Sequence, residues 1–196
     1  MALKIRRIFF AVISIAVLSL ASITNSQAAT PTFGHKYVSG VGDISIWLDY
    51  SSGVGYWQSY ITNASNNWMY PGWDNPIYTH FVSSNYGSNM DFYLRYNAFW
   101  GGPGILAETR FYVNGPTQVD PSSSNWNFTN IYINNDAYSL PNITNDMALG
   151  TTIHEMGHAF GLAHTSDIYS IMCQTGAGRV VQRVQKTDND AINIIY

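Results

Sequence analysis

The chain has 196 residues, of which 46% are hydrophobic, 15% aromatic and only 11% charged, and its formal net charge is −3 at pH 7. This acidic balance, with no basic run beyond the N-terminus, argues against nucleic acid or an anionic membrane as a partner. The single cysteine permits no internal disulfide, so stability must come from packing and from bound metal ions.

The N-terminus has the pattern of a secretory signal peptide. Three basic residues precede an apolar run over residues 8–23, and the small residues after it predict cleavage after Ala28 or Ala29. An uncleaved membrane anchor is the alternative, but the run is short for a membrane span. Cleavage removes three of the nine basic residues and leaves six against twelve acidic residues, a net charge near −6. We therefore expect a signal peptide over 1–28 and a secreted, monomeric single domain over 29–196.

Hydrophobic patterns predict an α+β arrangement. Apolar residues alternate over 44–48 as in a strand, and they recur at helical spacing over 56–69. Residues 114–129 are polar, contain two prolines and are predicted to form a loop. Four further strands are expected between segments of Gly, Pro, Asn and Ser, over residues 77–82, 90–96, 107–113 and 130–134.

Residues 154–164 read His-Glu-Met-Gly-His-Ala-Phe-Gly-Leu-Ala-His. On a helix, His154 and His158 lie one turn apart on the same face and can bind one metal ion. Gly161 lets the chain leave the helix in a left-handed conformation and deliver His164 as a third ligand. Three protein ligands leave a fourth position for water, which indicates a catalytic zinc site. The alternative, a core helix with ordinary hydrogen-bonded histidines, leaves the joint spacing unexplained.

Glu155 follows the first of these histidines and can accept a proton from water at the metal. The helix that carries it is predicted to begin near residues 144–146, which offer capping oxygens. A final helix is predicted near the C-terminus, where Thr187 and Asp190 have the spacing of a capping box.

The sequence offers two further sets of candidate metal ligands. His35 and His80 could ligate a second ion, although solvated or core histidines are the simpler interpretation. Calcium could bind through Asp120, Asp136 or Asp146, but no loop has a recognisable calcium spacing.

The long histidine pattern resembles the zinc signature of the metzincin proteases, which is followed by a Met-turn. Residues 170–173, Ser-Ile-Met-Cys, stand where that turn is expected. The resemblance implies that Met172 forms an apolar floor beneath the zinc; a methionine that fills a core gap is the alternative. Cys173 is expected to be a buried apolar residue rather than a thiol that reaches the metal.

Other segments are similar to the matrixin branch of this class: residues 101–107 to its glycine-rich lead into the edge strand, 90–96 to the preceding strand, and 187–196 to its closing helix. The resemblance implies an α+β, zincin-type fold with a twisted mixed five-stranded sheet, an active-site zinc helix, a Met-turn and a C-terminal helix. The chain lacks the cysteine-containing latency segment and the histidine-rich structural zinc site of matrixins, and Thr165 rather than Ser follows the third histidine.

By this resemblance, the protein is expected to be a zinc metalloendopeptidase with one catalytic zinc ion, a protein or peptide substrate and Glu155 as general base. The substrate is expected to lie along the edge strand at Ile105, Leu106, Ala107, Glu108 and Thr109. Two alternatives remain: a zinc-containing binding module without catalysis, and a zinc hydrolase of non-protein amides.

Overall fold

The computed structural model describes residues 28–102 and 104–196. The predicted signal peptide, apart from its last residue, and Pro103 of the glycine-rich segment lie outside the described residues. Within the described part of the chain, no helix is long and apolar enough to cross a membrane.

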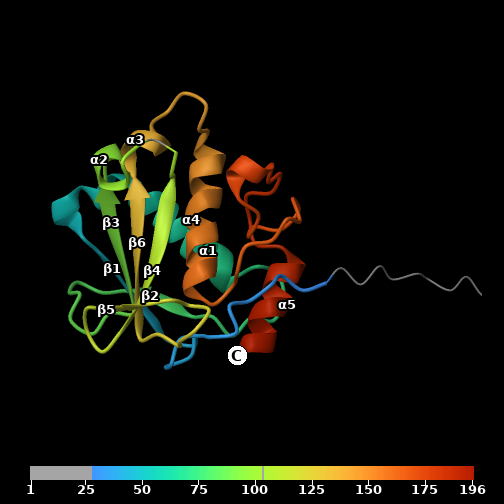
Figure 1. The fold of residues 1–196 in the computed structure, drawn as a ribbon. Coiled ribbons are helices and arrows are strands. Elements are labelled where there is room, and N and C mark those ends of the chain that lie inside the picture. Colours follow the sequence, from blue (N-terminus) through green and yellow to red (C-terminus); the bar gives the residue numbers. More distant parts are fainter. Residues whose placement is uncertain (1–27, 103) are drawn as a thin grey trace, which may run out of the picture.

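One mixed sheet organises the molecule (Figure 1), with the strand order β2-β1-β3-β6-β4-β5. Strands β2, β1, β3 and β6 run parallel, whereas β4 is antiparallel to both of its neighbours. The strands are β1 Ile44–Leu48, β2 Thr79–Phe81, β3 Met90–Arg95, β4 Ala107–Val113, β5 Thr117–Val119 and β6 Phe128–Asn134.

The sheet has six strands rather than the expected five. Strand β5 lies inside residues 114–129, which the sequence predicted to be a loop. Asn114 and Gly115 both adopt positive φ angles, 47° and 86°, and turn the chain back so that β5 pairs with the end of β4. A three-residue strand is too short to produce an alternating pattern, which explains why it was missed.

Two long helices, α1 and α4, pack against each other beside the sheet, and α5 lies near the C-terminus (Figure 1). The indole Nε1 of Trp68 in α1 donates a hydrogen bond of 2.9 Å to the backbone oxygen of Ile153 in α4, which ties the two helices together. The helices are α1 Gln58–Met69, α2 Asn97–Trp100, α3 Asn135–Tyr138, α4 Asn145–Ala159 and α5 Lys186–Ile195.

Two helix predictions need correction. The first helix was expected from residue 56, but a 3-10 turn over Val54–Trp57 precedes α1. The capping box of the last helix is formed by Gln185 and Asp188, not by Thr187 and Asp190. The capping residues stand two positions earlier because the helix begins at Lys186, and Gln185 supplies a side-chain acceptor that the usual Ser or Thr pattern does not include.

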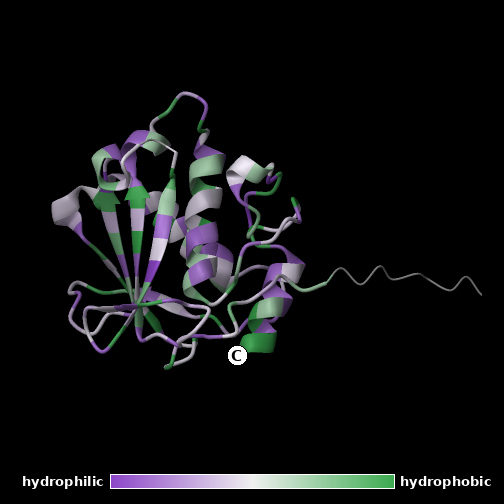
Figure 2. Cartoon of the chain, viewed as in Figure 1, coloured by the Kyte–Doolittle hydropathy of each residue, from purple (hydrophilic) through white to green (hydrophobic). Residues whose placement is uncertain are grey.

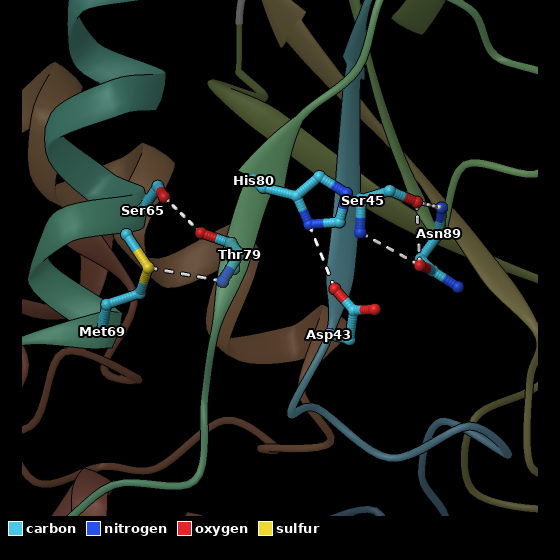
Figure 3. Close-up of polar contacts among 7 residues, drawn as sticks. All are labelled: Asp43, Ser45, Ser65, Met69, Thr79, His80 and Asn89. Atoms are coloured by element: carbon cyan, nitrogen blue, oxygen red, sulfur yellow. Dashed lines mark hydrogen bonds and ion pairs between the residues drawn. The ribbon is translucent and has the colours of Figure 1, made fainter.

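The edge of the sheet at β1 and β2 is held by polar pairs (Figure 3). His80 Nδ1 lies 3.2 Å from Asp43 Oδ1, and the hydroxyls of Ser65 in α1 and Thr79 in β2 are hydrogen-bonded. His80 therefore lies beside a carboxylate at the sheet edge without a hydrogen bond from Nδ1, and it is not part of any metal-binding group among the described residues.

Candidate metal centre

Helix α4 carries several buried polar side chains. Its N-cap, Thr144, accepts a hydrogen bond of 3.2 Å from the backbone N–H of Met147, as the sequence predicted. Every residue from 150 to 159 is buried, and Figure 2 shows hydrophilic bands in this part of α4. Polar side chains buried in this way need partners or a function.

The three histidines of the motif converge on one point. The Nε2 atom of His164 lies 3.2 Å from Nε2 of His154 and 3.0 Å from Nε2 of His158. His154 and His158 are buried, and His164 is exposed. The sequence spacing thus places two rings on one helix face and brings the third back from the following turn.

Backbone carbonyls fix the orientation of both helical rings. His154 Nδ1 lies 2.8 Å from the oxygen of Ile171, and His158 Nδ1 lies 2.8 Å from the oxygen of Leu162. An Nδ1–H that donates to a carbonyl leaves the Nε2 lone pair facing the other rings. Burial lowers the pKa of His154 well below its usual value and that of His158 to about 4, so both rings are neutral at pH 7. Neutral imidazole is the form that binds metal.

This donor set fits zinc. Tetrahedral Zn–N bonds of roughly 2.0–2.1 Å place two ligand nitrogens about 3.4 Å apart, close to the separations observed here. Three imidazole nitrogens at these separations can hold one zinc ion when each presents its lone pair to it. Among the described residues, these histidines form the one group of three metal-binding side chains, and none of the three aspartates considered for calcium belongs to such a group.

Gly161 allows the turn that brings in the third histidine. Its φ of +104° lies in the left-handed region, and a side chain there would also place its Cβ 3.1 Å from the backbone oxygen of His35. The N–H of Leu162 closes the helix by donating a hydrogen bond of 3.0 Å to the oxygen of Gly157.

Glu155 is buried beside the histidines, and Thr109 of β4 orients it. The Thr109 hydroxyl lies 2.8 Å from Glu155 Oε2 and 2.9 Å from the backbone oxygen of Glu155. Burial raises the pKa of Glu155 to about 7, and the hydrogen bond from Thr109 opposes that rise. A carboxyl group with a pKa near neutrality can both accept and return a proton.

We expect Thr109→Val to reduce kcat for peptide hydrolysis roughly tenfold, as is typical when a partner that orients an active-site group is removed. The substitution preserves the shape of the side chain and deprives Glu155 of its hydroxyl donor. Steady-state kinetics on one peptide would measure the effect, and Thr109→Ser, which retains the hydroxyl, should recover most of it. A valine variant with the parent kcat would show that Thr109 does not position Glu155.

Met172 is fully buried and lies against the zinc helix. A Cβ built on Gly157 would stand 2.4 Å from its sulfur, so α4 and the turn touch at this glycine. Asp188 of α5 secures the same turn, because its carboxylate accepts hydrogen bonds from the Ser170 hydroxyl and, at 3.1 Å, from the N–H of Ile171. Since Ile171 also holds His154, α5 is linked through the turn to the metal centre.

A cleft of about 680 Å³ runs past the histidines. Of the residues expected to bind substrate, Ile105, Leu106 and Ala107 line the cleft, whereas Glu108 and Thr109 do not. Glu108 instead accepts hydrogen bonds from Arg110 and Trp100.

Two contributors to the site were absent from the sequence interpretation: Asp188, and Thr109 as a partner of Glu155. Each acts across a long sequence separation, which a local motif does not report. The paired acidic residues at the start of the last helix were a usable indication for Asp188. Cys173 is buried, as expected.

The mixed sheet, the helix with two inward-facing histidines and the third histidine after a glycine turn define a metallopeptidase of the zincin fold. The matrixin family model matches residues 74–196, more than half of the chain, and the chain therefore belongs to the matrixin family. No curated protein sequence matches the chain. The matched range contains the histidine triad and the turn around Met172. Membership implies zinc and the hydrolysis of peptide bonds.

Proposed function

We propose that this protein is a secreted zinc endopeptidase in which His154, His158 and His164 hold the metal and Glu155 is the general base. The observation that carries the proposal is the convergence of three neutral imidazole nitrogens beside a buried, oriented carboxylate in an open cleft.

The chemistry divides between metal and protein. Zinc, when bound, polarises the scissile carbonyl and lowers the pKa of water to about 7. Thr109 holds Oε2 of Glu155, which leaves Oε1 to take a proton from the attacking water. The water oxygen bonds to the carbonyl carbon, the carbon–nitrogen bond breaks, and Glu155 returns the proton to the leaving amine.

The substrate would bind as an extended strand along β4. Strand β5 pairs only with Phe111, Tyr112 and Val113, so the beginning of β4, next to the cleft, has one edge without a strand partner among the described residues. Backbone hydrogen bonds along this edge would hold a peptide with little regard to its side chains. This edge favours a protein substrate over a small amide.

A non-catalytic zinc-binding module and a hydrolase of small amides are the competing functions. A purely structural metal site needs no buried carboxylate held beside the open coordination position.

Secretion as a monomer, with one domain over 29–196, is part of the proposal. It predicts that the protein released from cells begins at residue 29 or 30.

The deciding experiment is the cleavage of an unfolded protein by the mature, zinc-loaded chain. We expect cleavage, its loss after chelation and its return with one equivalent of zinc. Chelation should also lower the melting temperature by about 10 °C, because a ligand at 1,000 times its dissociation constant stabilises the folded state by about 4 kcal/mol. Bound zinc without cleavage of any unfolded protein or peptide would favour the binding module, and cleavage of small amides alone would favour the other hydrolase.

A further inference from the structure

Arg179 is a buried cation in the wall of the cleft. Only 7% of its surface is exposed. Its Nη1 donates to the backbone oxygens of Ile171 and Cys173, each at 3.3 Å. Its Nη2 lies 3.2 Å from Gln182 Oε1 and 3.5 Å from Thr151 Oγ1, a distance at the limit of a hydrogen bond.

None of these partners is negatively charged. Nε of Arg179 is buried and has no hydrogen-bond partner, and Arg179 takes part in none of the ion pairs between described residues. Among the described residues that line the cleft, Arg179 supplies the cation and Glu155 the carboxyl group, since burial lowers the pKa of each of the three histidines and keeps them neutral. Burial lowers the pKa of Arg179, and the nearby Glu155 carboxylate opposes that shift without an ion pair to the guanidinium. A buried guanidinium that no carboxylate contacts is costly, and arginine remains protonated at neutral pH.

Helix α4 makes room for this arrangement at Gly150. A Cβ at this position would lie 1.9 Å from Gln182 Oε1 and 3.1 Å from Arg179 Nη2. Glycine inside a helix costs about 0.5–1 kcal/mol relative to alanine. The sequence therefore has a poor helix former at a point where Gln182 and Arg179 approach the helix backbone.

We propose that Arg179 makes this part of the cleft a specificity pocket for an acidic substrate residue next to the scissile bond. Thr151 stands one helical turn before Glu155, so its contact with Arg179 places the guanidinium close to the reacting groups. This inference rests on the proposed function and names its substrate class: peptides with Asp or Glu beside the bond that is cut.

A substrate carboxylate would supply the negatively charged partner that the Arg179 guanidinium lacks. Nε–H and the outward Nη2–H of an arginine form a fork that fits the two oxygens of a carboxylate. Nη2 is held by the side chains of Gln182 and Thr151, whereas Nη1 is held by backbone oxygens, and Nε has no partner. This side of Arg179 can therefore exchange the Gln182 amide for a charged partner. The arginine is already desolvated in the folded enzyme, so the desolvation cost of forming this ion pair falls on the substrate carboxylate.

The test uses the zinc-loaded mature protein and peptides that differ only in one residue beside the scissile bond: Asp, Asn or Leu, placed on either side. We expect kcat/KM for the Asp peptide to exceed that for the isosteric Asn peptide by about tenfold to a hundredfold. Arg179→Met should abolish the difference. Gln182→Glu, which supplies an internal carboxylate, should also abolish it while the Leu peptide is still cleaved.

Arg183→Met is the matched control, since it removes the same charge at an exposed residue outside the cleft, and it should keep the preference. Binding provides a second measurement: the zinc-loaded Glu155→Gln variant should bind the Asp peptide more tightly than the Asn peptide in fluorescence anisotropy, and the preference should vanish when Arg179→Met is added. Equal values for Asp and Asn in both assays would overturn the pocket and leave the peptidase intact.

A uniform loss for all peptides in Arg179→Met, with the Asp preference retained, would show that Arg179 only supports the turn. If that variant does not fold, Gln182→Glu decides the same question. Failure to cleave any peptide would instead count against the proposed function, and the anisotropy ratio would still report on the pocket.

Discussion

Replacing Glu155 by Gln is expected to reduce kcat for peptide hydrolysis by about a thousandfold, within the range that general acid–base catalysis contributes. Gln has the same shape, and its amide oxygen can still accept the hydrogen bond from Thr109. It cannot take a proton from water. The fold and the histidine triad should be unaffected, so the variant should bind one zinc ion per chain.

The measurement is steady-state kinetics on a fluorogenic peptide, together with the zinc content of each protein. Asp190→Asn is a matched control, because it neutralises a carboxylate of an ion pair with Lys186 on α5, away from the cleft, and it should retain the parent kcat. A Glu155→Gln variant that binds zinc and keeps more than a tenth of the activity would exclude Glu155 as the base.

Strands β1 and β4 have the predicted bounds. Strand β1 buries alternate residues as expected, whereas the burial of β4 does not alternate, and its bounds follow from the glycine-rich segment before it and Asn114-Gly115 after it. The short helices α2 and α3 were not predicted, because four residues are too few for a helical period. Strand β5 was missed for the same reason, although Asn114-Gly115 is a turn sequence that could have indicated it.

The histidine triad could be predicted because its geometry is almost entirely local: two rings on one helix and a third after a glycine turn. The groups that tune the site are not local. Thr109 meets Glu155 across the sheet, and Asp188 reaches the turn from α5. Arg179 carries no motif, and its place in the cleft wall follows only from how the chain after Cys173 folds back on α4.

The contact between α4 and the methionine turn can be tested at Gly157. A Cβ there would stand 2.4 Å from Met172 Sδ and 3.0 Å from Trp68 Cζ2. Alanine would gain about 1 kcal/mol in helix propensity, whereas overpacking a tight core costs typically 1–3 kcal/mol or more. The separation of 2.4 Å is so short that the clash should dominate, and we expect Gly157→Ala to lower the free energy of unfolding by about 2 kcal/mol.

For a domain of this size, such a loss corresponds to about 4–8 °C in melting temperature. Activity should fall as well, since a displaced Met172 moves the neighbouring Ile171 carbonyl that orients His154. Thermal unfolding of the zinc-loaded protein would measure the first effect. Gly42→Ala is the control, because its Cβ would meet only the oxygen of Pro76 at an ordinary 3.8 Å.

A double-mutant cycle separates this clash from a general intolerance of the helix. Met172→Ala alone leaves a cavity and should cost about 2–5 kcal/mol. Combined with Gly157→Ala, it removes the sulfur that the new methyl group would strike, so the double variant should be more stable than the sum of the two losses predicts. Additive losses would mean that the methyl group is accommodated elsewhere and that Met172 does not press on the zinc helix. A coupling free energy of more than about 0.5 kcal/mol would establish that Met172 and Gly157 interact directly in the folded protein.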